Sequence, residues 1–244
     1  MTSKEFCRLG RGAGIAAVVI AALTVSETPA EAVSIQLDYD GTTVVLNDGD
    51  AGDQEVLSGS VQYVEGPSGT NFTDFSTLDF IGSLCTVCPS RINMESRIAL
   101  GTATAADDLV LRASQTGFTL NDAIDWFADS DFTSIFDGGS ATYSTYWDET
   151  DTLFGTSNLI DTDVLSGTAA TDFTSLIGAG DTASPFSLTI EVVYPAAALE
   201  GADTTLISTA QLRMSDVPIP ASAVLLLTGL GGLGFVARRR RARG

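Results

Sequence analysis

Apolar and polar residues alternate one by one along several segments of this chain, which is the pattern of β-strands with one buried face. Side chains alternate between the two faces of a strand but repeat every 3.6 residues on a helix, so these segments would not form an apolar stripe as helices. The clearest segment is PFSLTIEVVYP, whose apolar face consists of Phe186, Leu188, Ile190, Val192 and Tyr194. In TTLISTAQLRM the equivalent face consists of Leu206, Ser208, Ala210, Leu212 and Met214.

Five further segments have strand character and are separated by clusters of Asp, Gly and Asn that are typical of turns. A short helix is expected only over NDAIDWFAD (121–129), where Asn121 or Asp122 can cap the first turn. Many short strands without long helices predict an all-β fold, an antiparallel β-sandwich with one core over residues 33–216. The five segments are VSIQLDY (33–39), VLSGSVQYV (56–64), SRIALG (96–101), DLVLRAS (108–114) and ATYSTYW (141–147).

The charge of the chain is segregated along its length. Of the 12 Lys and Arg, three precede residue 12 and five follow residue 237, and of the 31 Asp and Glu three precede residue 33. Residues 33–216 therefore hold four cations, Arg91, Arg97, Arg112 and Arg213, against 28 anions, a net charge of −24. A surface this anionic repels nucleic acid and attracts cations, which excludes nucleic-acid binding as a function.

The chain has no histidine, which removes whole classes of catalytic and metal site. Ser-His-Asp and Cys-His nucleophile systems need that residue, and so do the His-ligated zinc, copper and non-haem iron sites. Any catalysis in residues 33–216 would have to use carboxylates, tyrosines or the two cysteines of that segment.

The first 32 residues have the three parts of a secretory signal peptide. A basic stretch with Lys4 and two arginines precedes an apolar run over residues 13–25, and the small-x-small sequence Ala30-Glu31-Ala32 follows it. The 13-residue run is short for a membrane-spanning helix, which needs about 20 residues. We therefore expect export, cleavage after Ala32 and an oxidising environment for the rest of the chain.

The last 28 residues combine a proline motif, an apolar run and a block of arginines. Residues 221–237 form a stretch of 17 without a charge, which as a helix would be about 25 Å long. Arg238, Arg239, Arg240 and Arg241 follow it, and such a cluster stays on the cytoplasmic side as a membrane stop. These residues by themselves predict a C-terminal transmembrane helix that anchors an exported acidic domain.

The order of these parts resembles a known class of bacterial sorting signal. Val217, Pro218, Ile219, Pro220 and Ala221, followed by the apolar run and the arginines, are similar to the PEP-CTERM class in its V-P-L-P-A variant, with Ile219 in place of the usual Leu. The resemblance implies an exported protein of an exopolysaccharide-producing Gram-negative bacterium, transiently anchored in the membrane and processed by an exosortase-type enzyme. The stretches VVLNDGDAGDQEVLSGSVQY and SPFSLTIEVVY also loosely resemble exported domains that precede such tails.

Cys85 and Cys88 form a C-x-x-C pair in SLCTVCPS, which allows three interpretations. A redox motif needs a helix start that lowers a thiol pKa, and the Pro89-Ser90 that follows does not predict one. A zinc site needs further ligands, but Cys7 lies in the signal peptide and histidine is absent. A local disulfide between Cys85 and Cys88 is the favoured prediction for an exported chain.

The segment NDGDAGDQE brings three aspartates, Asp48, Asp50 and Asp53, together with two glycines. Calcium takes about six to eight oxygen ligands, and an Asp-x-Asp spacing begins to supply them. The spacing departs from an EF-hand loop, because Asp53 comes one position late and no Glu occupies the last ligand position. A solvated turn between two strands is the favoured interpretation, with a calcium site as the alternative.

Each tryptophan stands beside acidic residues, Trp126 next to Asp125, and Trp147 next to Asp148 and Glu149. An aromatic platform with two carboxylates is the minimum for a glycoside hydrolase, but core packing of the tryptophans is the favoured interpretation. The sequence therefore predicts a non-enzymatic protein of the cell surface or extracellular matrix, without a cofactor. The alternatives are a calcium-dependent module that binds exopolysaccharide and a carboxylate-based hydrolase.

Overall fold

The fold was obtained as a computed structural model. It describes residues 33–55, 57–66, 71–84, 91–100, 105, 107–120, 125–135, 139–166, 170–179, 184–199 and 205–216, without the side chains of residues 125–127, 176–179, 205 and 216. Within these ranges, no helix is long and apolar enough to cross a membrane.

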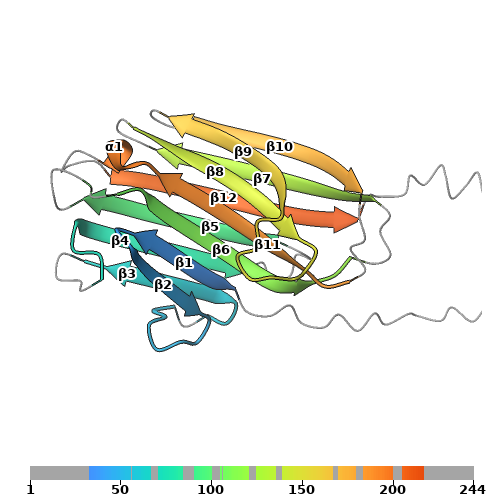
Figure 1. Cartoon of the computed structure of the whole chain (residues 1–244), viewed down its shortest axis with the longest axis horizontal. Coiled ribbons are helices and arrows are strands. Elements are labelled where there is room, and N and C mark those ends of the chain that lie inside the picture. Colours follow the sequence, from blue (N-terminus) through green and yellow to red (C-terminus); the bar gives the residue numbers. More distant parts are fainter. Residues whose placement is uncertain are drawn as a thin grey trace, which may run out of the picture.

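The described residues form two antiparallel sheets of six strands each (Figure 1). Sheet A consists of β1 (Ser34–Tyr39), β2 (Thr42–Asn47), β6 (Leu109–Phe118), β8 (Ser140–Asp148), β9 (Asn158–Ser166) and β11 (Phe186–Tyr194), in the order β2-β1-β6-β11-β8-β9. Sheet B consists of β3 (Ser60–Glu65), β4 (Phe75–Leu84), β5 (Arg91–Leu100), β7 (Asp125–Ile135), β10 (Ala170–Ala179) and β12 (Thr205–Asp216), in the order β10-β7-β12-β5-β4-β3. A single helical turn, α1 (Ala196–Leu199), follows β11.

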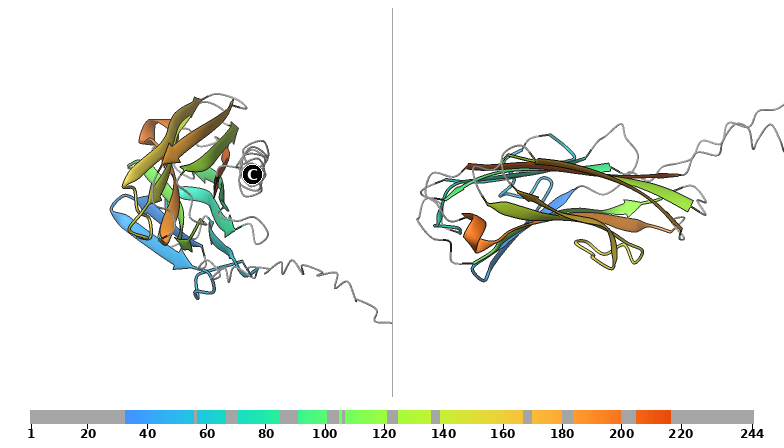
Figure 2. Two further views of the ribbon diagram at one scale, coloured as in Figure 1. Left: turned by 90° about the vertical axis from the view of Figure 1, so that its right-hand side faces the viewer. Right: turned by 90° about the horizontal axis from the view of Figure 1, so that it is seen from above.

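The two sheets lie face to face as the layers of a sandwich (Figure 2). Strands at equivalent positions contact each other between the layers: β2 and β3, β1 and β4, β6 and β5, β11 and β12, and β9 and β10. Four of these five pairs are consecutive in the chain, so the chain repeatedly crosses from one sheet to the other. The edge strands of sheet A, β2 and β9, lie beside the edge strands of sheet B, β3 and β10 (Figure 1).

The core lies between the inner faces of the two sheets. All five residues of the apolar face predicted for β11 are 0% exposed, and the five predicted for β12 are at most 2% exposed. The rings of Phe132 on β7 and Tyr143 on β8 stack across the two layers with their centroids 5.2 Å apart. The prediction of an all-β antiparallel sandwich is thus confirmed for the described residues.

Sheets A and B pack tightly where β1 contacts β4. A Cβ atom added at Gly82 of β4 would lie 2.6 Å from Cγ2 of Ile35 on β1 and 3.5 Å from Cβ of Ala113. Real side chains do not come that close, so the interlayer distance at this point depends on a glycine.

The helix predicted over residues 121–129 is wrong for its second half, because residues 125–129 begin strand β7; residues 121–124 lie outside the described ranges. Strand β7 pairs with β10 on one side and β12 on the other, and these ladders outweigh a local capping signal. The strands predicted from the sequence also did not include β2, β4, β7, β9 and β10. In β9 and β10, Asp161, Asp163 and Asp172 occupy inward positions, which obscures the alternation of apolar and polar residues.

Candidate functional site

The outer face of sheet A is partly covered by the loop that follows β8. The backbone N–H of Phe154 donates to Oγ of Ser114 at 3.0 Å, and Oγ of Ser187 donates to the carbonyl of Thr152 at 2.7 Å. Ser187 and Thr189, which alternation placed on the solvent side of β11, are therefore both 0% exposed. This part of sheet A has no open surface for a ligand.

The middle of the same face carries an ion-pair network. The guanidinium of Arg112 lies 2.9 Å from Asp38 on β1 and 2.7 Å from Glu191 on β11. The structure shows two ion pairs among the described residues, and Arg112 takes part in both. Arg112 thus joins β1, β6 and β11, and its charge is used within the fold.

The outer face of sheet B is different, because side chains from all six strands line up across it. We call these six residues the cross-strand row; each pairs in register with the next. The row runs from β10 to β3 through Phe173, Asp131, Gln211, Asn93, Ser83 and Ser60. With about 4.8 Å between neighbouring strands, it extends over about 24 Å.

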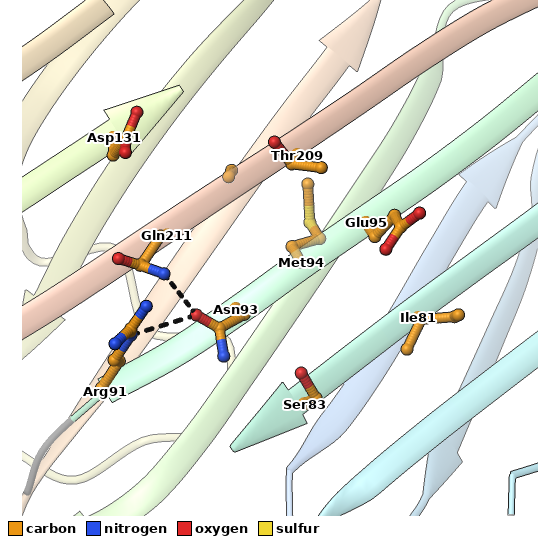
Figure 3. Close-up of a pocket in the computed structure, with 10 residues that line it drawn as sticks. Ile81, Ser83, Arg91, Asn93, Met94, Glu95, Asp131, Thr209 and Gln211 are labelled. Atoms are coloured by element: carbon orange, nitrogen blue, oxygen red, sulfur yellow. Dashed lines mark hydrogen bonds between the residues drawn. The ribbon is translucent and has the colours of Figure 1, made fainter. Parts of the chain in front are cut away.

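A pocket of about 370 Å³ lies on this face over β4, β5, β12 and β7 (Figure 3). Oδ1 of Asn93 accepts hydrogen bonds from Nε2 of Gln211 at 2.8 Å and from Nε of Arg91 at 3.2 Å. Asn93 is therefore held with its amide nitrogen, an additional donor, directed away from these two partners (Figure 3). The pocket is lined by Ile81, Ser83, Arg91, Asn93, Met94, Glu95, Asp131, Thr209, Ala210 and Gln211.

Acceptors and an aromatic ring complete this surface. Glu95 and Asp131 line the pocket and are exposed. Phe173, next to Asp131 in the row, is 64% exposed on edge strand β10. Donors, acceptors and a flat apolar ring therefore lie on one continuous face, which suits a ligand with many hydroxyl groups and apolar patches.

Charge is distributed unevenly between this face and the rest of the protein. Three of the four cations of residues 33–216 lie on the outer face of sheet B, where four anions accompany them among the described side chains. This described part of the face is nearly neutral within a domain of net charge −24. The cations are Arg91, Arg97 and Arg213, and the anions are Asp79, Glu95, Asp129 and Asp131.

The three aspartates predicted as calcium ligands act as hydrogen-bond acceptors in the loop after β2. Asp50 accepts from the backbone N–H of Asn47 at 2.7 Å, and Asp48 accepts from that of Gly59 at 2.7 Å. Burial acts to raise the pKa of Asp53, but hydrogen bonds from three backbone N–H groups hold that pKa below its usual value. Within the described ranges, no group of three or more His, Cys, Asp and Glu side chains is placed to hold a metal ion. Calcium binding at this loop stays a prediction.

The prediction that Trp147 packs in the core is confirmed. Its side chain is 7% exposed and packs edge-on against Phe186, with the ring centroids 6.3 Å apart. The neighbouring Asp148 is 3% exposed and accepts hydrogen bonds from Thr150 and Ser157, so its carboxylate anchors a loop. The side chains of Asp125 and Trp126 lie outside the described ones.

A cluster of buried hydroxyl groups joins the two layers in the interior. The hydroxyl of Tyr194 on β11 lies 2.8 Å from Oγ of Ser96 and 2.6 Å from Oγ of Ser208, and the two serines are 2.8 Å apart. Burial raises the pKa of Tyr194. The three groups satisfy one another, which explains why a serine can occupy an inward position of β12.

Several predicted residues lie outside the described ranges. They are the cleavage residues Ala30 and Ala32, the cysteines Cys85 and Cys88, the sorting motif at 217–221 and the arginines at 238–241. Export, the disulfide and the membrane helix therefore stay predictions.

No model of a known protein family and no curated protein matches this chain. Solved structures share only a remote likeness. The adhesin domain of Epf from Streptococcus pyogenes is 12% identical with a TM-score of 0.42, over 77% of this chain and 60% of that one. The module TmCBM61 in complex with β-1,4-galactotriose is 10% identical with a TM-score of 0.29, over 51% of this chain and 71% of that one. The adhesin domain of Lys-gingipain from Porphyromonas gingivalis is 13% identical with a TM-score of 0.30, over 75% and 91%.

The cross-strand row cannot be recognised in the sequence. Its six residues come from six strands between residues 60 and 211, and only the register brings them together. The available signal was the outward polar set of two strands, Asn93 and Glu95 on β5 and Thr209 and Gln211 on β12. That signal marks a solvent face but does not distinguish a binding surface from ordinary exposed strand positions.

Proposed function

We propose that this chain is an exported protein of the bacterial cell surface that binds polysaccharide, without cleaving it, on the outer face of sheet B. The observation that carries the proposal is the cross-strand row with its pocket. Hydroxyl groups of a sugar both donate and accept hydrogen bonds, which matches the mixture of amide, carboxylate and guanidinium groups there. The exposed ring of Phe173 provides a surface on which an apolar sugar face can stack.

The rigidity of this surface supports binding of a flexible chain. The pocket residues are placed on β4, β5, β12 and β7, and Asn93 is held by two donors before any ligand arrives. Fewer side chains then have to be ordered on binding, so less of the interaction free energy is lost.

The proposal is tested by affinity electrophoresis of the exported protein in gels that contain a panel of polysaccharides. Phe173→Ala should weaken binding about 10- to 100-fold, because burial of a Phe side chain contributes about 1.5–3 kcal/mol. Val164→Ala is the matched control, since Val164 is 60% exposed on edge strand β9 of the other sheet. Retention by none of the polysaccharides, or equal effects of the two variants, would contradict the proposal.

The same assays separate the alternatives. Binding should be unchanged in a chelator, because Asp48, Asp50 and Asp53 already accept backbone hydrogen bonds. No new reducing ends should form, and their release by the protein but not by Glu95→Gln would favour a hydrolase.

Export and sorting by the C-terminal tail complete the proposal. We propose that an exosortase-type enzyme processes the tail after the apolar segment 221–237 has held the chain in the membrane. Intact-mass analysis of the exported protein should show a first residue of Val33 and no arginine block. Full-length cytoplasmic protein as the dominant form would contradict this part.

A further inference from the structure

We propose that the polysaccharide is uncharged, and that an internal stretch of its chain lies across the strands of sheet B. This inference rests on the proposed polysaccharide binding and specifies both the chemical class of the ligand and the part of it that is bound. It is based on the charge of the pocket and on the direction in which the side chains of this face are aligned.

The pocket carries more negative than positive charge. Its described lining holds one guanidinium, that of Arg91, and two carboxylates, those of Glu95 and Asp131. Both acidic side chains are exposed, so a chain bound in the pocket would contact them directly. An acidic group on the ligand would then lie against like charges, and groups in direct contact are screened little by salt. A sugar hydroxyl instead donates a charge-assisted hydrogen bond to a carboxylate.

The other two arginines of this face each have a carboxylate opposite them on one side. Arg213 of β12 is in register with Asp129 of β7 and, on its other side, with Arg91 of β5. Arg97 of β5 is in register with Asp79 of β4. Opposite charges in directly opposite positions of a sheet attract each other. The domain as a whole has a net charge of −24, which repels a polyanion, so both the local and the overall charge favour an uncharged ligand.

A second row of side chains runs beside the cross-strand row, and each of its members also pairs in register with the next. Both rows begin on edge strand β10 and end on edge strand β3, and side chains from both rows line the pocket (Figure 3). With about 4.8 Å between neighbouring strands, they extend in parallel over about 24 Å. The second row consists of Thr171, Thr133, Thr209, Glu95, Ile81 and Gln62.

This alignment suits the middle of a polysaccharide chain. The units of a repeating polymer offer the same hydroxyl groups one after another, so successive units can make similar hydrogen bonds along the two rows. Because both rows reach the edge strands, a chain that follows them passes over both edges of the sheet. None of these contacts requires a chain end.

The charge of the ligand is tested by isothermal titration calorimetry of the exported protein with pairs of polymers that share a backbone. The pairs are hydroxyethylcellulose and carboxymethylcellulose, methyl-esterified and free polygalacturonate, and dextran and dextran sulfate. Where a pair binds, its neutral member should bind at least about tenfold more tightly.

Replacement of a pocket carboxylate tests the same point from the side of the protein. Glu95→Gln should weaken binding of the neutral polymer about three- to tenfold, because a charged acceptor for its hydroxyl groups is lost. The same substitution would strengthen binding of an acidic polymer, because a like charge is removed. Glu149→Gln is the matched control, since it removes the same charge from an exposed position directly after β8 of the other sheet.

The number of protein molecules bound to each polymer chain tests the internal position. A chain much longer than the sheet should bind many copies of the protein, whereas recognition of one end allows a single copy for each chain. Affinity for oligosaccharides of the same polymer should increase with their length until the rows are covered. Conversion of the reducing end to an alditol should leave the affinity of the longest oligosaccharide unchanged.

Each outcome decides between the levels of the proposal. Equal or tighter binding of the acidic member of a pair, or tighter binding by Glu95→Gln, would overturn the uncharged ligand but not the polysaccharide site. Equal losses in Glu95→Gln and Glu149→Gln would also overturn it, since the pocket carboxylate would then make no contact. One copy of the protein for each chain would overturn the internal position. Absence of binding to every polysaccharide would overturn the proposed function itself.

Discussion

Asp148 is the residue whose replacement tests the local energetics of this sandwich most directly. Its buried carboxylate accepts from the backbone N–H of Thr150 at 2.8 Å and from the hydroxyls of Thr150 and Ser157. The loop closes tightly over it, since a Cβ atom added at Gly155 would lie 2.5 Å from Oδ2 of Asp148. Asp148→Asn keeps the size of the side chain and removes its charge.

The expected loss follows from these three hydrogen bonds. Bonds to a charged acceptor are about twice as strong as neutral ones, so the exchange should cost about 1 kcal/mol for each, or about 2–3 kcal/mol in the free energy of unfolding. For a domain of this size that corresponds to a fall in melting temperature of roughly 5–10 °C. Urea unfolding, followed by tryptophan fluorescence, measures the change in free energy from the shift of the midpoint at unchanged slope.

Asp151→Asn is the matched control in the same loop. Asp151 accepts one hydrogen bond, from the backbone N–H of Gly117 at 2.8 Å, and its replacement removes the same unit of charge from the acidic domain. The left-handed backbone at Asp151 (φ 56°) is tolerated by Asn as it is by Asp. We expect a loss of about 1 kcal/mol or less.

The pH dependence gives an independent check. Burial acts to raise the pKa of Asp148, but hydrogen bonds from Ser157 and Thr150 outweigh it and hold the pKa below its ordinary value of 3.8. A carboxyl with a lowered pKa stabilises the fold while it is ionised, so its contribution is full above the ordinary value and is lost as the pH falls through the folded-state value. The difference between the wild type and Asp148→Asn should therefore be constant above about pH 5 and decrease below about pH 4. Equal losses in the two variants, or a difference that persists in acid, would refute this reasoning.

Three further predictions concern other parts of the protein. Gln115→Met should be neutral or stabilising in urea unfolding, because both polar atoms of the fully buried amide lack a hydrogen-bond partner among the described residues; a loss above about 2 kcal/mol would contradict this. Asp161→Asn should raise the melting temperature at pH 7, because burial and nearby carboxylates raise the pKa of Asp161, so that its ionised form destabilises the fold. This gain in melting temperature should disappear as the pH falls below the ordinary pKa of 3.8, and a gain that persists in acid would contradict the prediction. Calcium and magnesium should raise the melting temperature equally and only at low sodium, whereas a calcium-specific rise that Asp50→Asn removes would establish the calcium site.

The sequence by itself determined the class of the fold and the main faces of its longest predicted strands. A period of two residues in PFSLTIEVVYP and TTLISTAQLRM is a local property of a strand with one apolar face, and the apolar face of each segment is buried as predicted. Composition likewise determined the strong negative charge and excluded histidine chemistry, since neither depends on how the chain folds.

The tertiary structure decided which polar residues are buried and which form a surface. Ser187 and Thr189 occupy positions that alternation assigns to the solvent side, but a loop covers them. Ser208 occupies a position that alternation assigns to the core, and its hydroxyl forms a hydrogen bond within a buried cluster of hydroxyl groups. The helix over residues 121–129 was predicted from a local capping signal, whereas residues 125–129 begin strand β7 because they pair with β10 and β12, which lie far away in the sequence.

The cross-strand row depends most strongly on the tertiary structure. Its neighbours, such as Gln211 and Asn93, are separated by 118 positions in the chain and meet only through the register of β12 with β5. The same register places Arg213 opposite Arg91, and no local pattern in either strand predicts that pair. Strand pairing in a sandwich is set by the burial of whole faces, so the contacts between side chains on the outer face follow from the packing of the inner one.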